Sequence, residues 1–196
     1  MHEALEIINL LWQGGYQSYE GKYLTLEDAR IWDLPDQLPA IAVAAGGPGA
    51  ARLAAHHGSG LFATEPEASY IEEFTKAGGS GPKYAEVPMA WAETEDAAVQ
   101  EALEKSRWAL TGWPVMSELP NPVNFDAASG SVNAEDIKGQ FSVGPDLDAH
   151  LEQVKPFVEA GFDHIVLQNT GPDPDGFIAV CRSEFIERVK SLAPSS

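Results

Sequence analysis

The stretch Leu38-Pro39-Ala40-Ile41-Ala42-Val43-Ala44-Ala45-Gly46-Gly47-Pro48 gives the strongest indication of the fold. Its apolar part, residues 38–45, is a continuous run of the kind found in strands that are buried on both faces of a parallel sheet. The two glycines then turn the chain, and Pro48 suits the first position of a helix. The stretch therefore predicts a β-strand, a tight turn and an α-helix in succession.

Further apolar runs repeat this pattern along the chain. We expect strands at residues 38–45, 60–64, 84–91 and 162–169. Hydrophobic spacing typical of helices occurs at residues 4–12, 48–58, 67–76, 94–110, 146–161 and 177–192. Strands that alternate with helices form parallel sheets through right-handed crossovers, either as an open doubly wound sheet or as a closed (β/α)8 barrel.

The length of the chain limits how much of a barrel it contains. A complete barrel has eight units and usually about 250 residues, whereas this chain has 196 residues. The sequence therefore predicts an α/β fold of parallel (β/α) units of the TIM-barrel type, with four strands that make about half a barrel. We expect one domain over residues 1–196, with an irregular insertion at 111–145. A second loop-rich segment, 13–38, is expected to form a hairpin or covering loop with extended pieces near 18–25 and 30–33.

The charge of the chain excludes two classes of partner. It has 30 Asp and Glu against 12 Lys and Arg, a formal net charge of -18. Such a surface repels nucleic-acid phosphates and anionic lipid headgroups, so we expect neither nucleic acid nor membrane as a partner. The single cysteine, the lack of a signal-peptide pattern and the lack of an apolar stretch near the ~20 residues of a membrane span favour a cytoplasmic protein.

The turn after the first strand has the features of an anion site. Gly46 and Gly47 leave backbone N–H groups uncovered, and the start of the next helix adds partial positive charge. A phosphate fits such a turn, with Arg52 as the nearby cation. Because the carboxyl ends of neighbouring barrel strands face one ligand, Thr64 is expected at the same mouth. The alternative is a tight strand-to-helix turn that binds nothing.

The other titratable residues favour structural roles. His56 and His57 are adjacent, and adjacent helix residues point about 100° apart. Because no further ligand lies nearby at suitable spacing, we interpret both as packing or surface residues and expect no metal site. Similar structural roles are expected for His150, His164 and Cys181, and the segment Asp173-Pro174-Asp175-Gly176 is interpreted as a turn.

A series of ordered motifs resembles one protein family. They are Leu10-Leu11-Trp12-Gln13-Gly14-Gly15-Tyr16, Tyr19-Glu20-Gly21-Lys22-Tyr23, residues 25–31, 39–48 and 57–62, and Val154-Lys155-Pro156-Phe157-Val158-Glu159-Ala160-Gly161-Phe162-Asp163-His164. Through essentially all of its length the chain resembles the luciferase-like monooxygenase superfamily. More narrowly, it resembles the deazaflavin-dependent branch, which uses coenzyme F420 and is related to the glucose-6-phosphate dehydrogenases.

The resemblance implies a barrel that holds a flavin-like ring and exchanges a hydride with a substrate carbon. The positions it assigns to the cofactor's phosphate and tail are Ala45, Gly46, Gly47, Gly49 and Ala50, and it assigns Thr64 to the substrate. Relatives that take a sugar phosphate have a Lys just after the strand that matches residues 62–64. Here the chain continues with Glu65 and Glu67, whose carboxylates would repel a dianion, so glucose 6-phosphate is not the expected substrate.

The resemblance also implies that the family's general acid/base histidine and ring-contacting residues precede the first helix of this chain. We therefore assign no catalytic residue and interpret the chain as the carboxyl-terminal half of such an enzyme: a truncated reading frame, an excised fragment or a half-barrel that pairs with another chain. The expected partners are a small-molecule substrate and either a second copy, in a homo-oligomer, or a missing amino-terminal half.

Two other functions stay open at this point. The first is a luciferase-like monooxygenase that uses FMN and oxygen. The second is a non-catalytic half-barrel that self-associates, because it would otherwise leave two sheet edges and an apolar sheet face uncovered.

Overall fold

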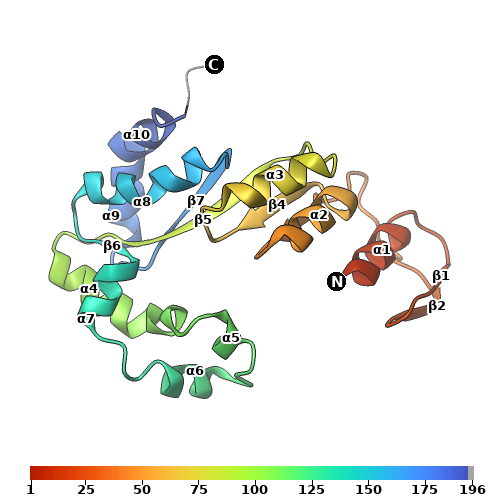
Figure 1. The fold of residues 1–196 in the computed structure, drawn as a ribbon, viewed down its shortest axis with the longest axis horizontal. Coiled ribbons are helices and arrows are strands. Elements are labelled where there is room, and N and C mark those ends of the chain that lie inside the picture. Colours follow the sequence, from red (N-terminus) through yellow and green to blue (C-terminus); the bar gives the residue numbers. More distant parts are fainter. Residues whose placement is uncertain (194–196) are drawn as a thin grey trace. The chain divides into compact units, whose positions relative to one another are not determined.

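The computed structural model describes residues 1–193 and has the α/β fold with parallel strands that the sequence predicts (Figure 1). The chain divides into two compact units. Unit 1 comprises Met1–Ala85 and Ala160–His164, and unit 2 comprises the rest of the described chain. Strands β5 (Lys83–Ala90) and β7 (His164–Asn169) contribute residues to both units.

Unit 1 contains a hairpin and the first two complete (β/α) units. Its elements are α1 (His2–Leu11), β1 (Gln17–Glu20), β2 (Thr25–Ala29), β3 (Ala42–Ala44), α2 (Pro48–His57), β4 (Gly60–Ala63), α3 (Ala68–Lys76) and the start of β5. Strands β1 and β2 pair antiparallel, which confirms the expected hairpin. The extended piece expected at residues 30–33 is wrong, because β2 ends at Ala29 and the chain beyond it has no strand partner until β3.

The parallel pairing in unit 1 fixes the positions of the strand ends. Strand β3 pairs with β4, with Ala44 opposite Phe62, and β4 pairs with the start of β5. Helix α2 packs against α3 and against both β3 and β4 (Figure 1). Val43 and Ala45 are buried, whereas Ala42 and Ala44 are exposed. Because side chains alternate along a strand, one face of β3 is covered by helix and the other is open.

Unit 2 contains the rest of the parallel strands and the insertion. Its elements are the end of β5, α4 (Glu95–Ser106), the 3₁₀ helix η1 (Arg107–Thr111), α5 (Trp113–Met116), α6 (Pro122–Ala128), α7 (Ala134–Gln140), β6 (Ser142–Val143), α8 (Leu147–Glu159), most of β7, α9 (Pro174–Val180), the π-helical turn η2 (Cys181–Phe185) and α10 (Ile186–Lys190). A hydrophobic core of small and large side chains holds the insertion to α4. Its buried members are Ala90, Ala92, Ala98, Ala102, Ile137 and Phe141.

Unit 2 has a side-chain cap at the start of α4 and differs from the expectations in two places. Thr94 caps α4, since its hydroxyl accepts a hydrogen bond of 3.3 Å from the Ala97 N–H. The expectation missed β6, which pairs parallel with the end of β5. The segment from Asp173 is more than a turn, because the Asp173 carboxylate caps the N-terminus of α9 through the Gly176 N–H.

Two glycines follow helices for different physical reasons. Gly161 follows α8 with a φ of 99°, the left-handed conformation that glycine tolerates. Gly58 follows α2, but its φ is -105° and the chain is extended there. Gly58 is needed for space instead, because a Cβ would lie 2.9 Å from the Ala54 carbonyl oxygen. In the part of the chain that the structure describes, no helix is long and apolar enough to cross a bilayer.

Candidate functional site

The turn after β3 lies at the carboxyl edge of the parallel strands in unit 1. The Ala45 N–H donates a hydrogen bond of 2.8 Å to the Phe62 carbonyl oxygen and extends the parallel register by one residue. The same register places the residues after β4 beside the residues after β3. Thr64 directly follows β4 and is exposed. The structure therefore brings the glycine turn and Thr64 to one edge, as the sequence predicted.

The glycines of this turn are not required by the fold of the chain itself. Gly47 has a φ of 167°, an extended conformation that any residue adopts. A Cβ built on Gly46, Gly47 or Gly49 meets no atom within 4 Å. By contrast, a Cβ on Gly81 would lie 1.7 Å from the Ser59 carbonyl oxygen. The space above the turn is open, so a ligand can approach the backbone there closely.

Backbone donors in the same turn have no acceptor in the helix. The first helical hydrogen bond runs from the Ala51 N–H to the Gly47 carbonyl oxygen, at 3.1 Å. No side chain within residues 1–193 caps the N-terminus of α2. The N–H groups of Gly49 and Ala50 precede Ala51, the first donor of the helix, and so have no intrahelical acceptor. The helix start carries partial positive charge, so these groups favour an anion.

Arg52, expected to assist at this turn, is directed elsewhere. Its guanidinium lies 2.6 Å from a carboxylate oxygen of Glu73 on α3. The hydrogen bond from Arg52, with a second from Lys76, lowers the pKa of the Glu73 carboxyl. The partial positive charge that this turn offers a ligand therefore comes from its backbone N–H groups and not from Arg52.

The residues beside Thr64 are acidic. The Tyr70 hydroxyl donates a hydrogen bond of 2.9 Å to Glu65, which fixes this carboxylate close to the end of β4. Burial and this hydrogen bond both raise the pKa of Tyr70, so the hydroxyl stays protonated and keeps donating. Glu67 lies at the N-cap position of α3 and is exposed. Two carboxylate side chains therefore follow, within three residues, the position assigned to substrate.

Asn169, at the carboxyl end of β7 in unit 2, was missed by the sequence interpretation. Its side-chain oxygen accepts hydrogen bonds from the N–H groups of Trp91, at 2.8 Å, and Gly171, at 3.0 Å. These two donors fix the orientation of the amide, and its Nδ2 is then buried without a hydrogen-bond partner among the described residues. The sequence signal for Asn169 was its position, because it is the last residue of the expected strand 162–169.

The isolated histidines and the cysteine have structural surroundings. His150 is fully buried, with Nε2 at 2.9 Å from the Gly144 carbonyl oxygen and Nδ1 at 2.7 Å from the Ser142 hydroxyl. Because a carbonyl only accepts, Nε2 carries the proton and Nδ1 accepts from the hydroxyl. Burial lowers the pKa of His150 and holds the ring neutral. Burial likewise raises the pKa of the Cys181 thiol. His164 is exposed and contacts Asp163 at 2.7 Å.

A cavity in unit 1 lies at the C-terminal end of α2, opposite the glycine turn. It has a volume of about 620 Å³, and Glu6 and His57 are among its lining residues. The hydroxyl of Tyr19 donates a hydrogen bond of 2.6 Å to Glu6, and this bond is the main cause that raises the pKa of Tyr19 to about 12. His2 does not line this cavity, but its Nε2 lies 3.5 Å from Glu6 Oε1. The sequence interpretation found no further ligand near His56 and His57, because the contact with His57 joins helices that are distant in the chain.

Comparison with known proteins gives a family match over most of the chain. The model of the family described as "Luciferase-like monooxygenase" matches residues 1–164. A curated relative, the F420-dependent glucose-6-phosphate dehydrogenase of Microbacterium testaceum (strain StLB037), is 30% identical over 204 aligned residues. The alignment covers 97% of this chain and 60% of the relative. The chain thus spans about 60% of the length of this relative.

Solved structures show the same fold. An F420-dependent secondary alcohol dehydrogenase, solved with an F420–acetone adduct, is 22% identical with a TM-score of 0.77, and the match covers 95% of this chain and 60% of that one. A type II Baeyer–Villiger monooxygenase component from Pseudomonas putida, solved with FMN, is 18% identical with a TM-score of 0.58 and covers 98% and 63%. Both are similar to this chain in fold, and they hold different cofactors.

Proposed function

The chain belongs to the luciferase-like monooxygenase family, and from this premise we propose that it forms part of a coenzyme F420-dependent oxidoreductase. The proposed reaction moves a hydride between the deazaflavin and a small organic substrate. The observation that carries the proposal is the glycine turn after β3, where a Cβ on any of the three glycines meets nothing within 4 Å. The naming of the curated relative supports F420 as the cofactor.

The turn fits the anionic part of such a cofactor. The N–H groups of Gly46, Gly47, Gly49 and Ala50 would hold its phosphate and tail, and buried Ala45 would support the turn from below. When bound, the deazaflavin supplies hydride transfer. The contribution of this chain is to bind and orient the anionic tail through main-chain groups, in a protein whose net charge of -18 disfavours anions elsewhere.

The substrate end of the proposed site favours a neutral molecule. Thr64 is exposed at the carboxyl edge and offers one hydroxyl. Glu65, held in place by Tyr70, and Glu67 would repel a phosphate dianion. We therefore propose an uncharged organic substrate in place of glucose 6-phosphate, the substrate in the name of the relative.

Complete catalysis is proposed to need residues from outside this chain. The open face of β3 supports this, since Ala42 and Ala44 are exposed on it, and Val166 of β7 is 45% exposed. Removing an apolar strand face from water stabilises the assembly by roughly 25 cal/mol per Å² of buried surface. Either an amino-terminal barrel half or a second copy of the chain would cover it. We place the assembled enzyme in the cytoplasm.

Titration with oxidised and reduced coenzyme F420 tests the proposal. The chain is titrated alone and together with the amino-terminal half of the Microbacterium testaceum relative. Saturable binding of F420 in either setting is the expected result. If F420 does not bind even when the amino-terminal half is supplied, the proposal is wrong.

The alternative function keeps the fold and uses FMN with oxygen. This alternative is supported by the structure from Pseudomonas putida, which has a similar fold and contains FMN. The same titration with FMN separates the two, because bound FMN and bound deazaflavin have different absorption spectra. Preferential binding of FMN would replace the F420 proposal, and binding of neither cofactor would leave the non-catalytic, self-associating half-barrel.

A further inference from the structure

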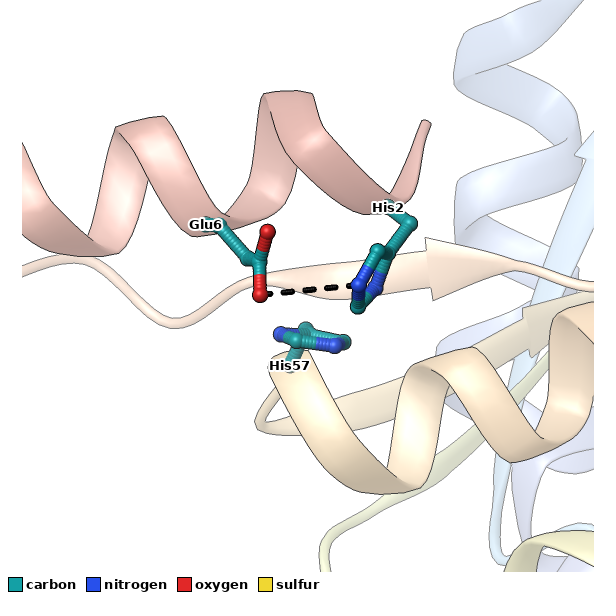
Figure 2. A group of neighbouring side chains, drawn as sticks. All are labelled: His2, Glu6 and His57. Atoms are coloured by element: carbon teal, nitrogen blue, oxygen red, sulfur yellow. Dashed lines mark ion pairs between the residues drawn. The ribbon is translucent and has the colours of Figure 1, made fainter. Parts of the chain in front are cut away.

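Three side chains with metal-binding atoms meet between two helices of unit 1. His2 and Glu6 lie four residues apart on α1, so they project from the same face of the helix. His57 is the last residue of α2, and Figure 2 shows both α1 side chains directed toward its ring. One potential ligand atom from each residue lies within 4.8 Å of the other two. We propose that His2, Glu6 and His57 bind a divalent transition metal ion of the zinc class.

This site is separate from the proposed cofactor turn. The turn precedes the N-terminus of α2, whereas His57 ends the helix, which spans Pro48–His57. A helix of that length separates its two ends by about 15 Å. The metal site therefore involves none of the groups assigned to the cofactor.

The ligand chemistry suits Zn²⁺. Two imidazole nitrogens and one carboxylate oxygen are typical zinc ligands, and a water molecule completes the tetrahedron. With zinc–ligand bonds near 2.1 Å, the ligand atoms of a tetrahedral site lie about 3.4 Å apart. His2 Nε2 and Glu6 Oε1 are already 3.5 Å apart. The rings of His2 and His57 have centroids 4.5 Å apart, and the 60% exposed side chain of His2 can rotate to close the remaining gap.

Neighbouring contacts orient two of the ligands. The Tyr19 hydroxyl donates to Glu6 Oε2, at 2.6 Å, while Oε1 faces His2. Asn9 donates from Nδ2 to the His57 carbonyl oxygen, at 3.1 Å, and so holds the end of α2 against α1. Hydrogen bonds to ligands and to their backbone are typical of metal sites and reduce the reorganisation that binding requires.

The electrostatic surroundings favour a cation. His57 lies at the C-terminus of α2, where the helix dipole contributes partial negative charge. Glu6 and His57 line the cavity of about 620 Å³, so the fourth coordination position has access to water. The net charge of -18 raises the local concentration of divalent cations around the chain.

Calorimetric titration with ZnCl₂ tests this site, with chain that carries no polyhistidine tag. Wild-type protein is expected to bind one zinc ion. His2→Ala and His57→Ala each remove a ligand, and should weaken binding more than the roughly 10- to 100-fold loss expected for Tyr19→Phe, which removes only an orienting hydrogen bond. Because the His2 side chain is exposed, His2→Ala keeps the test valid if His57→Ala fails to fold.

His56→Ala is the matched control. His56 lies next to His57 on the same helix and is exposed, but it is outside the group of three. Its replacement should leave zinc affinity unchanged, and zinc should raise the melting temperature of wild type and His56→Ala but not of His2→Ala. Co²⁺ in place of zinc should show the visible spectrum of tetrahedral coordination. Wild type that binds no zinc, or an affinity that is equally affected by His56→Ala and His57→Ala, overturns the proposal.

Discussion

Replacing Gly49 with alanine should stabilise the chain while weakening cofactor binding. Gly49 is the second residue of α2, follows Pro48, and has a backbone conformation open to all L residues. A Cβ on it meets nothing within 4 Å. Glycine to alanine at a compatible helical position stabilises by about 0.4–1 kcal/mol, mainly because the unfolded chain has fewer conformations.

The two effects are measured separately. For a chain of this size, about 0.4–1 kcal/mol raises the melting temperature by roughly 1–4 °C, which thermal denaturation followed by circular dichroism detects. A methyl group in a space that the cofactor fills costs about 1–3 kcal/mol, a loss of roughly 5- to 150-fold in F420 affinity. Gly81→Ala is the control in the same unit, because its Cβ would lie 1.7 Å from the Ser59 oxygen and should lower the melting temperature.

Two results would refute the reasoning. If Gly49→Ala lowers the melting temperature, the chain itself requires glycine at this position and the open space is not available. If the melting temperature rises and F420 still binds as tightly as to wild type, the turn does not contact the cofactor. Gly49→Ala is expected to raise the melting temperature and to weaken F420 binding. Because general damage to the fold would lower both, it cannot produce this combination.

Other variants test the remaining features. His150→Gln should cost about 1–3 kcal/mol by disturbing a buried hydrogen-bond network. Burial lowers the pKa of His150, so the stabilisation that the neutral ring gives wild type is complete above about pH 6.5. Below that pH the stabilisation declines by at most about 1.4 kcal/mol per pH unit. His150→Gln should therefore flatten the pH dependence of stability, measured by urea unfolding between about pH 6.5 and 4.5. Asn169→Ala should destabilise by about 1–3 kcal/mol, since the Trp91 N–H loses its acceptor, whereas unchanged urea unfolding would contradict this. Glu67→Lys should tighten glucose 6-phosphate binding about two- to fivefold in calorimetry with the assembled enzyme, and no change would argue against substrate binding at this edge.

The sequence was sufficient for strands that form long apolar runs. Strands β3, β4, β5 and β7 each lie within or at the edge of an expected range, since burial on a sheet demands consecutive apolar residues. Strand β6 has only two residues, Ser142 and Val143, and no run of that length is distinctive. It is defined by its pairing with the end of β5, which continues in the 2.9 Å bond from the Gly144 N–H to the Ala90 oxygen.

Proline caused the main errors in the insertion and beyond it. Residues 111–145 were expected to be irregular and residues 173–176 to form a turn, yet Pro114, Pro122 and Pro174 each lie in the first turn of a short helix. The same property explains both outcomes, because the proline ring lacks an N–H and fixes φ, which breaks a helix interior but suits its start. Side-chain caps distinguish the cases: Asn121 caps one of these helices and Asp173 another.

The sequence predicted the part of the candidate site that follows from the succession of strands along the chain. It did not predict the contacts between helices α1 and α2. The glycine turn and Thr64 follow consecutive strands, so parallel pairing brings them together. The meeting of His2 and Glu6 with His57 depends on how α1 packs on α2, which hydrophobic periodicity does not specify. The spacing of His2 and Glu6 on one helix face was the available signal.

The acidic composition and the glycine turn follow from one electrostatic requirement. Cations are few and many are engaged in ion pairs, as Arg52 is with Glu73 and Lys83 with Asp163. An anionic ligand at this turn therefore gains little from Arg52, and the backbone N–H groups are the donors that the turn itself offers. Main-chain donors are reached closely only where no side chain covers them, which is why glycine belongs at this turn. The same surplus of carboxylates has the opposite consequence at Glu6, where it favours a metal ion. One charge distribution thus explains why the proposed anion site is built from backbone and the proposed cation site from side chains.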